Sequence, residues 1–175
     1  MMLRSAWTRA LLATSLLGLS ACAAGPARPA KGGPVDVGTG SLVEARKYLE
    51  GRWTLESFDV HPPGKAVITP KVMGTLRYDA FGNLGMEIRA DQAASALLQA
   101  SGIEIQNGVI STTGRTAVDM QNHTLTYIVE GQPESLGPLA ARRPRYWQVE
   151  GKLLTLTIKD DAGAPASVSR WRKAN

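Results

Sequence analysis

The sequence predicts an all-β fold, an antiparallel β-barrel with a short N-terminal helix and one short inserted helix. From residue 51 to residue 173, short runs rich in β-branched, aromatic and leucine residues alternate with Gly, Asn, Asp and Pro, a pattern typical of strands joined by tight turns. The predicted folded part, residues 41–175, is long enough to bury one hydrophobic core. Because a sheet of roughly six to nine strands must protect its edges, we expect it to close into a barrel.

Residues 1–21 have the pattern of a secretory signal peptide. Arg4 and Arg9 give a positively charged start, an apolar run follows from Ala10 to Leu19, and Ser20 and Ala21 are small. This run is well short of the ~20 apolar residues that cross a bilayer, so we expect no permanent transmembrane helix from it. Membrane residence would require another anchor.

Leu19-Ser20-Ala21-Cys22 contains the only cysteine of the chain and resembles the bacterial lipobox. This resemblance implies that Cys22 is acylated, with palmitate among its acyl chains, and becomes the first residue of a mature lipoprotein. Ala23 follows where an Asp often retains lipoproteins in the inner membrane, which implies an outer-membrane protein facing the periplasm. The alternative is an ordinary cleaved signal with an incidental cysteine. In either case, a single cysteine forms no internal disulfide.

Residues 22–40 follow as the acylated cysteine and a tether. The segment is rich in Gly, Pro and Ala and lacks apolar periodicity, so it predicts a flexible linker. We therefore expect three parts: a signal peptide over 1–21, the anchor and tether over 22–40, and the β-barrel domain over 41–175.

The barrel domain should begin with a short helix. Ser41 and Glu44 have the spacing of a capping box, and Gly51 is a suitable stop. The apolar side of this helix would carry Leu42, Ala45 and Leu49.

Six runs have the clearest strand character: residues 52–60, 71–78, 84–90, 124–130, 145–150 and 152–160. Hairpin turns are predicted at 79–83, 121–123 and 150–152, and Asp160-Asp161 before Gly163 indicates a further turn. The second helix is expected over residues 91–101. Asp91 would cap it, and its buried side would carry Ala94, Leu97 and Leu98.

The opening of the first predicted strand, Gly51-Arg52-Trp53, resembles the start of the lipocalin barrel. More specifically, the chain is similar to the bacterial lipocalin-like domain family. The matching elements are Gly51, Trp53, Leu55 and Ser57; Tyr78 and Gly82; Gly114-Arg115-Thr116; and residues 146–157 and 170–173. The chain departs from the family where Arg115-Thr116 replaces an aromatic position and where Tyr127-Ile128 stands in place of histidines, so any site those histidines form is absent.

The resemblance implies a structural closure of one barrel end by Gly51, Trp53, Arg170 and Arg172. In lipocalins the opening tryptophan plugs the barrel, and an arginine of the last strand covers its ring, a cation–π contact. Either Arg170 or Arg172 could take that role.

No catalytic or metal-binding pattern accompanies these elements. His61 and His123 are the only histidines, and neither has metal-ligand spacing to another His, Cys or carboxylate. No nucleophile elbow or nucleotide-binding loop is present. The sequence therefore predicts no enzyme, cofactor or metal. The formal net charge is +5, and basic residues gather at 142–145 and 170–173. This density is too low for a nucleic-acid interface, and we expect solvated strand ends, with binding to anionic headgroups as the alternative.

Alternation predicts eight inward-facing side chains that would line a ligand site or fill a solid core: Leu55, Leu76, Met86, Ile88, Tyr127, Trp147, Leu156 and Ile158. The leading hypothesis is a membrane-anchored lipocalin-like lipoprotein that carries a small hydrophobic or amphipathic ligand in the cell envelope. The alternative is a packed barrel that serves as a structural or interaction module for another envelope protein. An isomerase or hydrolase is the third and least favoured reading.

Overall fold

The computed structural model describes residues 35–36, 42–129 and 143–175 of the 175-residue chain. All of these residues belong to one compact unit, residues 31–175. The predicted signal peptide, Cys22 and the cap residue Ser41 lie outside the described residues. Among the helices that the structure describes, none is both long and apolar enough to cross a bilayer.

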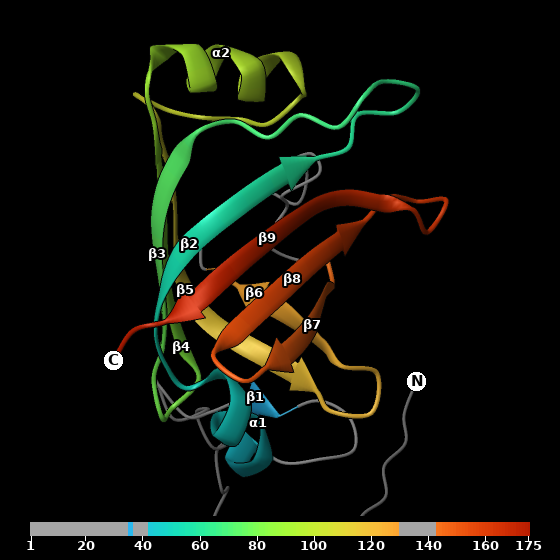
Figure 1. Ribbon diagram of the computed structural model, residues 1–175. Coiled ribbons are helices and arrows are strands. Elements are labelled where there is room, and N and C mark those ends of the chain that lie inside the picture. Colours follow the sequence, from blue (N-terminus) through green and yellow to red (C-terminus); the bar gives the residue numbers. More distant parts are fainter. Residues whose placement is uncertain (1–34, 37–41, 130–142) are drawn as a thin grey trace, which may run out of the picture. The chain divides into compact units, whose positions relative to one another are not determined.

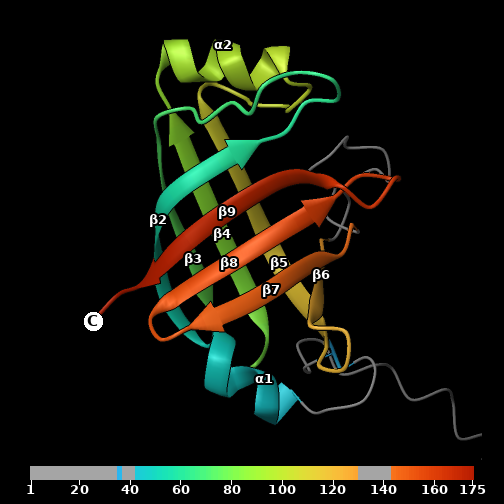
Figure 2. The ribbon, with the colours of Figure 1, turned by 45° about the vertical axis from the view of Figure 1, so that its right-hand side comes forward.

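Eight antiparallel strands form a closed β-barrel (Figures 1 and 2). The strand order is β5-β4-β3-β2-β9-β8-β7-β6, and pairing of β5 with β6 closes the circle. This confirms the predicted fold class. The strands are β2 (Gly51–Val60), β3 (Val72–Tyr78), β4 (Asn83–Ala90), β5 (Val109–Asp119), β6 (Thr124–Ile128), β7 (Arg145–Glu150), β8 (Leu153–Lys159) and β9 (Pro165–Lys173).

A short strand, β1 (Val35–Asp36), lies outside the circle. Its residues pair in parallel with Ala117 and Val118 of β5. Both residues fall within the segment predicted as a flexible tether, residues 22–40, and their pairing with β5 was not predicted. A two-residue strand leaves too little pattern to be recognised in a Gly/Pro-rich segment.

Two short helices flank the barrel, α1 (Leu42–Leu49) and α2 (Gln92–Ala100), and they lie toward opposite ends of it (Figures 1 and 2). Both were predicted. In α1, Ala45 and Leu49 are buried as expected. In α2, the Asp91 side chain accepts a hydrogen bond from the Ala94 N–H, which confirms the predicted cap.

The predicted apolar side of α2 is wrong at one position. Ala94 and Leu98 are buried, whereas Leu97 is 46% exposed. Residues 94 and 98 lie one helical turn apart and share a face, but residue 97 is rotated away from both by part of a turn. The next segment takes the place of the expected side chain, because Ile103 and Ile105 are buried in the same hydrophobic core as Leu98.

Three of the predicted turns are fixed by aspartates. Asp79 accepts backbone hydrogen bonds from Phe81 and Asn83 between β3 and β4. Asp119 and Asp160 accept equivalent backbone hydrogen bonds in the turns after β5 and β8. Because the carboxylate satisfies N–H groups that the turn leaves without a strand partner, each aspartate stabilises its hairpin.

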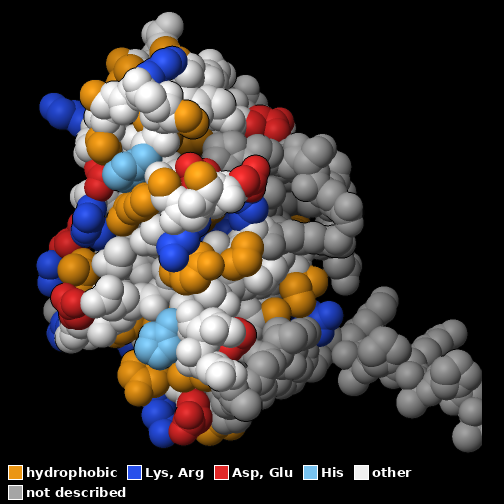
Figure 3. All heavy atoms as spheres, turned by 90° about the vertical axis from the view of Figure 1, so that its right-hand side faces the viewer, with side chains coloured by type: hydrophobic (Ala, Val, Ile, Leu, Met, Phe, Trp, Pro, Cys, Tyr) orange, Lys and Arg blue, Asp and Glu red, His pale blue; other side chains and the backbone are white. Residues whose placement is uncertain are grey.

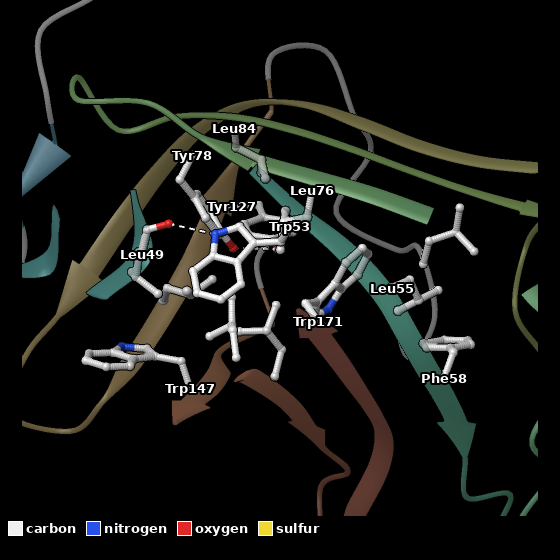
Figure 4. Close-up of a cluster of buried hydrophobic side chains, with 14 of the residues drawn as sticks. Leu49, Trp53, Leu55, Phe58, Leu76, Tyr78, Leu84, Tyr127, Trp147 and Trp171 are labelled. Atoms are coloured by element: carbon white, nitrogen blue, oxygen red, sulfur yellow. Dashed lines mark hydrogen bonds between the residues drawn. The ribbon is translucent and has the colours of Figure 1, made fainter. Parts of the chain in front are cut away.

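The α1 end of the barrel is closed by Trp53. Its side chain is 1% exposed, and its indole N–H donates to the Leu49 carbonyl at the end of α1, at 2.9 Å (Figure 4). In this way the first strand holds the helix across the barrel end. The predicted burial of Trp53 is confirmed.

The cation over Trp53 is not an arginine. The Lys173 ammonium lies 5.2 Å from the ring centre of Trp53. Trp171 points inward, so the side chains of its neighbours Arg170 and Arg172 point outward by strand alternation. Arg170 pairs with Asp59 at 2.7 Å, and Arg172 pairs with Glu56, both on the outer face of β2.

The predicted closure by Arg170 or Arg172 is therefore wrong, and Lys173 occupies that position. Gly51 also belongs to this end, since its φ is +135° and a Cβ there would lie 2.8 Å from the Lys173 side chain.

Candidate binding site

All eight side chains predicted to face inward do so. Seven are buried, and Met86 is partly buried against the core. Strand alternation explains this outcome, because one face of every strand in a closed barrel must fill the interior. Burial alone leaves open which of them border free space.

A cavity of about 40 Å³ lies within the barrel. Five of the eight predicted residues line it: Met86, Ile88, Tyr127, Leu156 and Ile158. The other three, Leu55, Leu76 and Trp147, belong to the packed core and do not line it.

Seven further lining residues were not predicted. Three are apolar (Phe58, Ile110, Trp171), three carry hydroxyls (Thr112, Ser167, Ser169), and one is Arg145. Small hydroxyl-bearing residues read as outward-facing strand positions in a sequence. Their inward direction could have been found from the alternation, since Ser167 and Ser169 share parity with the inward Trp171.

The cavity occupies the half of the barrel away from α1. It is lined near the end of β2, the end of β8 and the starts of β5, β7 and β9, and these strand ends all lie opposite the helix. The half nearer α1 is filled by large side chains, among them Trp53, Leu76 and Tyr78 (Figure 4). The cavity therefore lies toward one end of the barrel.

Arg145 is the most unusual residue of the site. Its side chain is buried, with only 5% of the residue exposed, and its guanidinium carbon lies 3.7 Å from the ring centre of Tyr127. One guanidinium nitrogen donates to the Arg143 carbonyl at 2.9 Å. The basic residues at 142–145 were predicted to be solvated, and this prediction is wrong for Arg145. Its parity with the inward Trp147 on β7 is the signal that identifies it.

Tyr127 connects Arg145 to a second buried phenol. The hydroxyl oxygens of Tyr127 and Tyr78 are 3.0 Å apart and share a hydrogen bond. Burial raises the pKa of both phenols, well above the usual value for Tyr78, and the nearby Arg145 offsets only part of that rise. Burial also lowers the pKa of Arg145, which the two tyrosines partly oppose. Both phenols are thus neutral at physiological pH, and each retains a hydrogen to donate.

Two other buried polar atoms have no hydrogen-bond partner among the described residues, the Thr116 hydroxyl and the indole N–H of Trp147. Thr116 is the strand partner of Tyr127 on β5. The Trp147 ring is stacked by His123, with ring centres 4.7 Å apart and planes within 8°. Trp147 thus belongs to the closed part of the barrel, where it is a packing residue.

Outside the cavity, the described residues contain no group of three or more side chains suited to hold a metal ion. The face shown in Figure 3 mixes acidic, basic and apolar side chains, with no broad area of one charge. Compared with protein-family models and with curated protein sequences, the chain matches none.

Proposed function

We propose that this protein is a lipid-anchored, lipocalin-like envelope protein whose barrel binds a small amphipathic molecule. The observation that carries the proposal is the cavity, which combines an apolar wall with polar groups confined to a few positions. Such a combination is typical of small-molecule sites, where apolar surface supplies affinity and a few polar groups fix orientation.

The size of the cavity limits the ligand. Sites for drug-sized molecules span ~300–1,000 Å³, whereas one water needs only ~10–15 Å³ of cavity. At about 40 Å³, the interior accommodates a short molecule or one end of a longer one. Met86 is the most flexible side chain of the cavity wall, and it is only partly buried against the core. Rotation of the Met86 thioether would enlarge the site at little cost.

The test is a cavity-filling variant with a matched control. Thr112→Phe places a large ring in the cavity, while Thr113→Phe places the same ring on the exposed outer face of the same strand. The full chain is purified from membranes, and the molecules that remain bound are identified by native mass spectrometry.

We expect a bound small molecule in the parent protein and in Thr113→Phe, and its loss in Thr112→Phe. Equal retention in both variants would contradict a site in the barrel. If the parent protein carries no molecule and takes up none from a lipid extract, the packed interaction module predicted as the alternative is favoured instead.

The membrane anchor is a separate part of the proposal. It rests on the Leu19–Cys22 motif and predicts that Cys22→Ser loses both acylation and membrane association. Fractionation and intact-mass measurement provide the readout. A Cys22→Ser protein that stays in the membrane fraction and keeps the lipid mass would contradict the anchor.

A further inference from the structure

We infer that the α1 end of the barrel docks on a phospholipid surface, with Val43, Tyr48 and Phe81 reaching into the headgroup layer. The inference rests on the membrane anchor of the proposed function for the direction from which the chain approaches, and it is independent of any ligand in the barrel. Three features of the described residues support it: where the chain enters the fold, which apolar side chains are exposed there, and how the charges around them are distributed.

The chain enters the fold at the α1 end. Val35 pairs with Ala117 close to the β5–β6 turn, and β1 lies at the same end of the barrel as α1 (Figures 1 and 2). Cys22 lies 13 residues before Val35, so the anchor is within about 45 Å of β1 even at full extension of the chain. The barrel is about 25–30 Å tall, since the 11 residues of β5 rise ~3.3 Å each along a strand tilted by about 40°. Contact through the opposite end would use more than half of that reach, whereas contact through the α1 end uses little of it.

α1 lies across the barrel end with one side turned to solvent. Ala45 and Leu49 face the core, whereas Val43 is 60% exposed and Tyr48 is 44% exposed. Tyrosine suits the boundary between headgroups and acyl chains, because its ring is apolar and its hydroxyl is polar. Lys47 is exposed on the same helix, and a lysine keeps its apolar stem in such an interface with its ammonium among the phosphates. Helices that lie in a membrane interface use this combination of side chains.

Phe81 extends this surface from the β3–β4 turn. The turn adjoins α1, because Gly51 at the start of β2 pairs with Tyr78 at the end of β3. Asp79 accepts the Phe81 backbone N–H at 2.8 Å, which fixes the turn. Tight turns favour Gly, Asn, Asp and Ser, and a phenylalanine that stays 60% exposed contributes little to the core. Burial of this ring against a partner would add stabilisation that the fold itself does not obtain.

The charges of the α1 end favour a lipid surface over a charged protein. The Lys47 ammonium lies 3.8 Å from the Glu44 carboxylate, and Glu150 and Lys152 are both exposed at the β7–β8 turn. Among the described residues of this end, the two signs are thus interspersed, and neither forms the one-signed patch that steers a charged partner. Docking on a bilayer needs no such patch, since partition of apolar side chains supplies affinity.

Two native methionines report which end meets the bilayer. Met120 is in the β5–β6 turn at the α1 end, whereas Met73 is exposed at the start of β3, at the opposite end. The full chain is placed in phosphatidylcholine nanodiscs with and without a lipid that carries a nitroxide on its headgroup, and the signals of ¹³C-labelled methionine methyl groups are recorded. We expect the nitroxide to broaden the Met120 signal and to leave that of Met73 unchanged. Because the contact is apolar, high salt should not alter this pattern.

A charge in the contact tests the side chains themselves. Phe81→Asp is compared with Leu97→Asp, since Leu97 is an exposed apolar residue on α2, at the opposite end. Both positions are exposed, so both variants should keep the thermal midpoint of the parent protein within a few degrees. Loss of an apolar contact of this size lowers the docking constant by about tenfold, so the broadening of Met120 should disappear in Phe81→Asp and persist in Leu97→Asp. Equal broadening in the two variants would overturn the contact.

The outcomes separate this inference from the membrane anchor, because intact mass shows whether Cys22 carries acyl chains. With the chains present, equal broadening of Met73 and Met120, or of neither, overturns the docking surface while the anchor stands. Without them the anchor fails, and the same measurement on protein added to the nanodiscs still decides: broadening of Met120 alone supports the surface, and its absence overturns it. Loss of the broadening in high salt contradicts the apolar contact. A Met120 signal that shifts with protein concentration and is not broadened assigns the surface to a second copy of the chain and overturns the lipid partner.

Discussion

Removal of the Trp53 side chain tests how the barrel end is closed. Trp53→Ala deletes a ring that is 1% exposed and contacts the core between α1 and the barrel. Truncation of a buried tryptophan costs about 3–5 kcal/mol of unfolding free energy. The Leu49 carbonyl also loses the indole donor, a contribution of about 1 kcal/mol. We therefore expect a loss of about 4–6 kcal/mol in total.

Urea denaturation, followed by circular dichroism, measures this loss. With a slope of about 2 kcal/mol per molar urea, the midpoint should fall by about 2–3 M. Trp53→Phe is the matched control, because it keeps an aromatic ring and removes mainly the hydrogen bond to Leu49. Its expected cost is smaller, about 1–2 kcal/mol. A Trp53→Ala protein with an unchanged midpoint would refute the assignment of this residue to barrel closure.

Two further predictions concern the strands. Gly114→Ala should destabilise the barrel by about 1–3 kcal/mol, because the new Cβ would lie 2.3 Å from the Ile128 carbonyl oxygen. Gly85→Ala is the control, since its Cβ meets nothing within 4 Å, and it should change stability by less than about 0.5 kcal/mol. Equal thermal midpoints for the two variants would contradict this prediction. Burial raises the pKa of Asp59, but hydrogen bonds from Thr69 and Arg170 and the charge of Arg170 outweigh it and lower the pKa overall. The ionised Asp59 therefore adds to the free energy of unfolding above the unfolded pKa of ~3.9, and this contribution is lost as the pH falls through the folded pKa. Asp59→Asn should make the unfolding free energy fall less steeply below about pH 4. The same pH dependence in variant and parent would contradict the pairing.

The strand pattern of the sequence predicts most of the fold and part of the site. Alternation is a local property, so it identifies the inward faces of β4 and β8 without any knowledge of the neighbours. Alternation also predicts that Arg145 faces inward, because it is two residues from the inward Trp147. It predicts that Arg170 and Arg172 face outward, because the inward Trp171 lies between them. The solvated Arg145 was predicted from local charge and the closure by Arg170 or Arg172 from the family resemblance, and strand alternation disagrees with both.

Other features depend on contacts between distant segments and cannot be predicted this way. Which inward side chains border the cavity depends on how eight strands pack together. The chain brings Tyr78 and Tyr127 together, 49 residues apart in sequence, and only the barrel closure through β5 and β6 sets their distance. The exposure of Leu97 likewise follows from Ile103 and Ile105, which cover the core beside α2.

The most direct test of the binding barrel uses two methionines of the same protein. Met86 lines the cavity on β4, whereas Met73 on β3 is 75% exposed on the outside. The methyl groups are labelled with ¹³C, and nuclear Overhauser effects to the molecule bound by the protein are recorded. The account predicts contacts from the ligand to the Met86 methyl and none to that of Met73. Contacts to Met73 alone, or to neither methyl group while a ligand is bound, would contradict a binding site inside the barrel.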